Sequence, residues 1–212
     1  MVRYVCCAGT RLFAAGLVAV CLAVSVAAQE KPKPTAPAQQ MSAAEKAMMD
    51  AMTAAMTPGE PHKLLASLAG EWAFTMTMWT SPGAPPETYH GTGTYTPILG
   101  GRYVQSAAKG VMMGMPFEGM GINAYDNVTK RFVSSWIDNF GTGIITFAGT
   151  QDAATKTITY TGEMADLLQP TAMVKVRELL RFVDANTHVM EWYETRGGKE
   201  VKTMQIDYVR KK

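Results

Sequence analysis

Two carboxylates that share strand faces with aromatic or aliphatic residues are the side chains best suited to chemistry in this sequence. Asp138 follows Trp136 by two residues in the run "RFVSSWID", so a β-strand would place both side chains on one face. Glu178 lies in "VKVRELLRF", on the face that it shares with Val176 and Leu180. Burial raises the pKa of such a carboxylate, which can then orient a polar ligand group or exchange a proton.

Each carboxylate also has a structural interpretation. Asp138 would cap the turn before Gly141 while the Trp136 ring belongs to the core. Glu178 would pair with a basic residue, Arg102 or Arg210, because an unpaired buried carboxylate is costly. An enzyme that uses Asp138 or Glu178 as acid or base is a third interpretation.

The standard signatures of catalysis and metal binding are missing from the sequence. It contains no G-x-S-x-G, H-E-x-x-H or C-x-x-C motif, and "GTG" at 91–93 and 141–143 lacks the third glycine of a dinucleotide fingerprint. We therefore predict no catalytic residue, no metal ligand and no cofactor.

The elements that must position these carboxylates are strands. From Glu71, apolar residues recur with period two, which is typical of a half-buried strand. Nine further runs of strand-like composition follow, at 87–97, 102–110, 117–125, 131–139, 143–150, 157–164, 173–183, 188–195 and 201–210.

The connections between these runs are too short for parallel crossovers, so the strands are antiparallel neighbours. We predict an all-β fold, an antiparallel up-and-down β-barrel of about ten strands. A barrel is preferred to a sandwich because closure removes exposed edge strands. The run "HKLLASLAGEW" places Leu64, Leu65 and Leu68 at helical spacing, which predicts a short N-terminal helix that caps one barrel end.

Three segments precede the barrel domain at 62–212. Residues 1–28 combine Arg3 and Arg11 with an apolar run that ends in small residues, as in a secretory signal peptide. Residues 29–40 are proline-rich and predict an extended tether. Residues 41–57 predict a helix rich in methionine and alanine, with Ser42 and Glu45 as its capping box.

Removal of the signal peptide changes the chemistry of the chain. All three cysteines lie within it, so the mature chain has no disulfide or thiol chemistry. Without Arg3 and Arg11, the 20 basic residues become 18, equal to the 18 acidic ones, and the net charge falls from +2 to zero. This balance excludes an electrostatic nucleic-acid interface, and no membrane span is expected after cleavage.

Several segments resemble the bacterial family of unknown function called DUF1579. The similar runs are "HKLLASLAGEW", "GGRYV", "MMGMPFEGMGINAYDNVTKRFVSSWID", "FAGTQD" and "MQIDYVRKK". The resemblance implies a calycin-like barrel, similar to lipocalins and fatty-acid-binding proteins, and it implies no particular reaction. Related barrels include haem-binding nitrobindins, but His62, His90 and His188 match no such ligand motif here.

We expect an exported protein, periplasmic or secreted, that binds a small apolar or amphipathic ligand in its lumen. Trp192 and Tyr193 face opposite ways, so only one of them can be internal. The candidate lumen residues are Trp72, Phe74, Trp136, Asp138, Glu178 and Tyr193. The alternative is a non-catalytic envelope scaffold that docks a partner through the methionine stripe of Met48, Met49, Met52 and Met56.

Overall fold

The computed structural model describes residues 41–80, 85–167 and 169–212. The structural results concern Met41–Lys212, which forms one compact unit. The expected signal peptide and tether lie outside the described residues.

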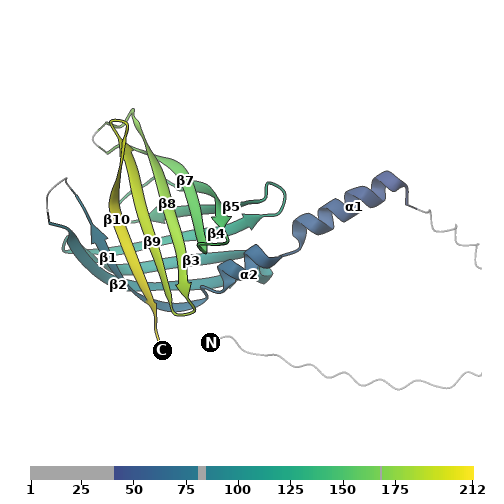
Figure 1. Ribbon diagram of the computed structural model, residues 1–212, viewed down its shortest axis with the longest axis horizontal. Coiled ribbons are helices and arrows are strands. Elements are labelled where there is room, and N and C mark those ends of the chain that lie inside the picture. Colours follow the sequence, from purple (N-terminus) through teal and green to yellow (C-terminus); the bar gives the residue numbers. More distant parts are fainter. Residues whose placement is uncertain (1–40, 81–84, 168) are drawn as a thin grey trace, which may run out of the picture. The chain divides into compact units, whose positions relative to one another are not determined.

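Ten antiparallel strands form a closed barrel in simple meander order, with β1 paired to β10, which confirms the predicted fold class. Figure 1 shows β8, β9 and β10 side by side, with the tip of the β9–β10 hairpin at one end and the C-terminus at the other. The strands are β1 (Gly70–Met78), β2 (Glu87–Ile98), β3 (Tyr103–Met112), β4 (Met115–Asp126), β5 (Arg131–Asp138), β6 (Ile145–Asp152), β7 (Thr157–Ala165), β8 (Met173–Asp184), β9 (Thr187–Arg196) and β10 (Lys199–Arg210).

Tight turns impose the meander. The β3–β4 hairpin turns at Met113 and Gly114, whose φ angles are both positive (51° and 74°). Paired positive φ angles characterise the two-residue turns whose twist matches antiparallel strands. The methionine-rich segment 110–121 therefore forms a tight hairpin.

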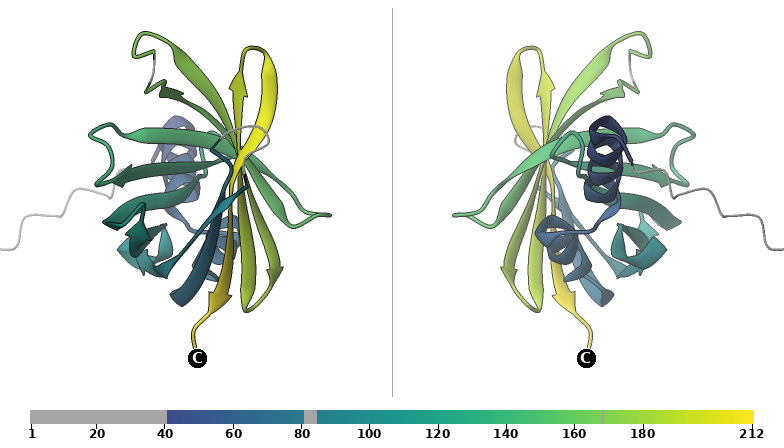
Figure 2. Two further views of the ribbon diagram at one scale, coloured as in Figure 1. Left: turned by 90° about the vertical axis from the view of Figure 1, so that its left-hand side faces the viewer. Right: turned by 90° about the vertical axis from the view of Figure 1, so that its right-hand side faces the viewer.

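The helix α2 (Glu60–Ala66) closes one end of the barrel, as the spacing of its leucines predicts. It contacts β3, β4 and the short 3₁₀ segment η1 (Leu99–Gly101), and Leu65 and Leu68 are fully buried. The right-hand view of Figure 2 faces the side of the barrel on which α2 lies. We call this the closed end.

The helix α1 (Ala43–Met56) begins at the predicted capping box, in which Ser42 and Glu45 bond reciprocally. None of its residues is buried. Its last carbonyls, those of Ala54 and Ala55, and that of Thr57 accept bonds from the Asn127 side chain in the β4–β5 turn. Among the described residues, no helix has the length and hydrophobicity to cross a membrane.

Candidate functional site

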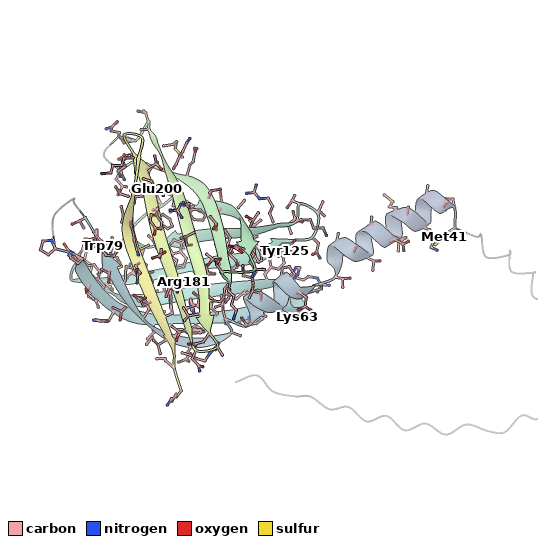
Figure 3. All side chains as sticks on the ribbon, viewed as in Figure 1. Met41, Lys63, Trp79, Tyr125, Arg181 and Glu200 are labelled. Carbon is pink, nitrogen blue, oxygen red and sulfur yellow. The ribbon has the colours of Figure 1, made fainter. Side chains whose placement is uncertain are left out.

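A cavity of about 270 Å³ lies inside the barrel, away from α2. Its wall includes Phe140, which is partly exposed in the loop after β5, so the cavity reaches the surface there. We call this the open end. In Figure 3, Trp79 and Glu200 lie toward the open end and Tyr125 and Lys63 toward the closed end. The principal lining residues are Phe74, Met76, Tyr95, Ser106, Met112, Phe117, Asn123, Ser134, Trp136, Asp138, Phe140, Phe147, Glu178, Leu180, Met190, Trp192, Met204, Ile206 and Tyr208.

Glycines let aromatic rings lie against the barrel wall. The Trp136 ring covers Gly119 and Gly121 on β4, and a Cβ atom added at Gly119 would lie 2.3 Å from Trp136 Cζ2. A Cβ atom at Gly91 would lie 2.3 Å from Phe74 Cζ across the β1–β2 pair. A side chain at either glycine would therefore collide with the ring, so these positions require glycine for the rings to approach the wall this closely.

Glu178 projects into the cavity from the middle of β8. It lies opposite Tyr160 on β7 and Trp192 on β9 in the strand register. Within the described residues, it makes no hydrogen bond or salt bridge. Desolvation raises the pKa of Glu178 from 4.5 to about 7. This carboxyl group is therefore close to half ionised at neutral pH.

The tyrosines near Glu178 are held neutral. Burial raises the pKa of Tyr160, Tyr208 and Tyr95 above the ordinary value, and the negative charge of Glu178 adds to the effect. The Tyr160 hydroxyl is buried without a hydrogen-bond partner in the described structure. These hydroxyls supply no positive charge to balance Glu178.

A polar strip lines the opposite wall. Ser134 Oγ donates to Asn123 Oδ1 (3.2 Å), and Asn123 Nδ2 donates to Ser106 Oγ (3.3 Å). The strip crosses β5, β4 and β3 in adjacent positions and borders the cavity. It can hydrogen-bond a neutral polar group.

Asp138 lies at the open end and combines two of the roles considered from sequence. One carboxylate oxygen accepts from Trp136 Nε1 (2.9 Å), and the other accepts from the Phe140 backbone N–H (2.9 Å). Asp138 thus fixes the Trp136 ring and caps the turn, while also lining the cavity.

A packed aromatic cluster separates the cavity from the closed end. His188 stacks on Tyr208 with ring centroids 4.3 Å apart and meets the Trp72 ring edge-on at 4.3 Å. Tyr95 Oη lies 3.3 Å from His188 Nε2. Burial, together with the charge of Arg210, lowers the pKa of His188 from 6.5 to about 3, so the ring is neutral.

Phe74, Trp136, Asp138 and Glu178 of the six candidate lumen residues line the cavity together. Trp72 does not: it is 1% exposed in the closed-end cluster, where its Nε1 donates to the Leu68 carbonyl (2.8 Å). Trp72 lies near the start of β1 and bonds to Leu68, directly after α2, so it lies toward the closed end and outside the cavity wall.

The choice of Tyr193 was wrong, because its side chain lies on the outer wall under the Arg177 guanidinium, 4.1 Å from the ring centroid. Trp192 is the internal residue of the pair. β9 has bulky residues on both faces, so its pattern alone does not determine the direction of either ring. The strand register determines it: Trp192 pairs with Glu178 on β8, whose side chain lines the cavity, so the Trp192 side chain also points inward.

The expected salt bridge of Glu178 is also wrong. Arg210 donates to the carbonyls of Ser67 and Ala185 and lies over the Trp72 ring, and Arg102 donates to Leu99. Both guanidinium groups bond to backbone carbonyls of connecting segments at the closed end, whereas Glu178 lies in the middle of its strand.

Sequence reasoning missed Tyr95, Tyr208 and the polar strip, and of Trp192 and Tyr193 it chose the residue on the outer face. Each lies at an alternate position of a predicted strand, so period two was a usable signal once one inward residue per strand was known. Among the described residues, no group of three or more His, Cys, Asp or Glu side chains is placed to hold a metal ion.

Comparison with known proteins agrees with the fold. The crystal structure of Rv2717c from M. tuberculosis matches 73% of this chain and 100% of its own, with a TM-score of 0.52 and 14% identity. No curated protein matches the sequence. The model of the family described as "Protein of unknown function (DUF1579)" matches residues 57–210, a range that contains α2 and all ten strands. The chain therefore belongs to the DUF1579 family.

Proposed function

We propose that this protein is exported and binds a small apolar or amphipathic molecule inside its barrel. The observation that carries the proposal is the open cavity, whose wall combines aromatic rings and methionines with the carboxyl group of Glu178, which has no partner in the part of the chain that the structure describes. Small-molecule sites are typically apolar with a few convergent polar groups.

The cavity volume limits the size of the ligand. An enclosed apolar cavity of about 150 Å³ holds benzene, and the pockets that bind drug-sized ligands have volumes of about 300–1,000 Å³. At about 270 Å³, this lumen suits a molecule between these sizes. The unbranched side chains of Met76, Met112, Met190 and Met204 let the wall adapt to ligand shape.

Native mass spectrometry of protein purified from its own host's envelope tests the proposal. We expect a defined adduct that dissociates on activation and is identified after solvent extraction. An apo mass that stays unchanged after exposure to lipid and metabolite extracts would contradict ligand binding.

Export is proposed from the sequence of residues 1–28, whose charged start, apolar run and small-residue end favour a signal peptide. The mature protein would then act in the periplasm or outside the cell.

A second candidate function rests on α1. Met48, Met49, Met52 and Met56 are each about half exposed or more, and a methionine-rich surface can dock varied partners. Deletion of residues 41–57 would then abolish partner co-purification while the barrel stays folded. Unchanged co-purification would argue against a docking role for α1.

A further inference from the structure

The charge of the cavity wall narrows the class of ligand. Asp138 and Glu178 are its acidic residues, and no Lys, Arg or His belongs to the described wall. Asp138 is already bonded to the Trp136 indole and the Phe140 amide, whereas Glu178 has no hydrogen-bond or ion-pair partner among the described residues. A ligand carboxylate would have to approach two acids with no cation beside it.

The rings around Glu178 favour a cation as well. Eight aromatic side chains belong to the described wall, and Trp192 is the direct cross-strand neighbour of Glu178. The faces of tryptophan, tyrosine and phenylalanine rings attract ammonium groups, most strongly where water is excluded. One carboxylate among such rings matches an ammonium group that is attached to an apolar body.

We infer that the ligand is a small hydrophobic amine, whose ammonium group pairs with Glu178 while its apolar part fills the aromatic lumen. This inference rests on the proposed function, because it names the chemistry of the molecule that the cavity takes. An amine ligand would distinguish this protein from carriers of fatty acids, because a fatty-acid head group is negatively charged.

The titration of Glu178 gives a second, independent test, which is the pH dependence of amine affinity. The titratable groups that face it are Tyr160 from β7, Tyr208 from β10 and Tyr95 from β2, and all three stay neutral. Because the pKa of Glu178 is about 7 in the empty barrel, the carboxylate is mostly protonated at acid pH. Amine affinity should therefore fall as the pH drops below neutrality.

Three probes with the same apolar body separate the possible ligand chemistries: phenylbutylamine, phenylbutanol and phenylbutyrate. Binding of each to the full mature protein is measured by isothermal titration calorimetry at about pH 8, where Glu178 is ionised. We expect the amine to bind at least about tenfold more tightly than the alcohol, and phenylbutyrate to bind least.

The variant Glu178→Gln keeps the side-chain volume and removes the charge. It should weaken amine binding at least about tenfold and leave alcohol binding within about twofold. The matched control is Glu163→Gln on the exposed outer face of β7, which removes the same charge away from the lumen and should change neither affinity. Thermal melting of both variants establishes that they are folded.

The pH dependence of binding to the wild-type protein tests the same pairing without a substitution. Between about pH 8 and pH 5, amine affinity should fall at least tenfold, while alcohol affinity stays constant.

The outcomes distinguish this inference from the proposed function. If the alcohol or the carboxylate binds as tightly as the amine, and Glu178→Gln changes nothing, the lumen binds ligands but the amine inference is wrong. If none of the three probes binds, the proposed lumen function fails and the inference fails with it.

Discussion

Glu178 and His188 are ionisable residues inside the barrel, and they make its stability depend on pH in opposite directions. Burial raises the pKa of Glu178 to about 7 and lowers that of His188 to about 3, so both side chains favour their neutral forms inside the barrel. Glu178 borders open space and can gain a ligand partner, whereas His188 lies between the Trp72 and Tyr208 rings. The first is a candidate binding group, and the second is a packing group.

The variant Glu178→Gln should become progressively more stable than the wild type as the pH rises. The folded-state pKa lies above the ordinary 4.5, so the stability that Glu178 contributes is present below about pH 4.5 and is lost as the pH rises to about 7. Urea unfolding at about pH 5 and pH 8 should show a relative gain of about 2–3 kcal/mol for the variant. A constant difference between the two proteins would mean that Glu178 is solvated.

The variant His188→Phe should resist acid better than the wild type. Because the folded-state pKa of His188 lies below the ordinary 6.5, its contribution is present above about pH 6.5 and is lost as the pH falls toward 3. Between about pH 7 and pH 5, the wild type should lose about 2 kcal/mol of unfolding free energy relative to the variant. Parallel pH profiles in urea unfolding would show that His188 protonates freely in the folded barrel.

At the scale of elements, the two helices differ in what they bury. α2 inserts Leu65 into the closed end and is followed directly by the buried Leu68, whereas α1 buries no residue and meets the barrel turn through Asn127. Stability should therefore depend on α2 and hardly on α1.

Truncation of Leu65 and deletion of α1 test this difference between the two helices. Leu65→Ala removes a side chain that is 1% exposed and should cost about 2–5 kcal/mol in unfolding free energy. Deletion of residues 43–56 should change it by less than about 0.5 kcal/mol, because surface changes have small effects. Chemical denaturation measures both, and a large loss on deletion would mean that α1 packs on the barrel in solution.

At the scale of the whole molecule, the closed meander pairs each of the ten strands on both edges and surrounds the cavity. The family carries no known activity, so the contents of that space decide the function.

The intact mass of protein isolated from the host envelope should correspond to a chain that begins at Gln29. Removal of residues 1–28 takes away Arg3, Arg11 and all three cysteines, so the mature protein should also be unreactive toward thiol reagents. A mass that includes residues 1–28 would show that the apolar segment is retained as an anchor.

The sequence by itself determined the strands, their antiparallel order and the family. Period-two runs separated by short turns leave few topologies open, and Leu64, Leu65 and Leu68 predicted the capping helix at the correct place. Phe74, Trp136, Asp138 and Glu178 were also identified, because each shares a strand face with other inward residues.

Only the tertiary structure decided which face of β9 is internal, where the cavity ends and whether Glu178 has a partner. Tyr193 and Trp192 are both bulky, so their direction depends on the register with β8, which is a long-range property. Trp72 lies below the cavity because α2 closes that end, and Arg102 and Arg210 bond to chain carbonyls there instead of reaching Glu178. Distances between strands far apart in sequence are set by barrel closure, which no local pattern encodes.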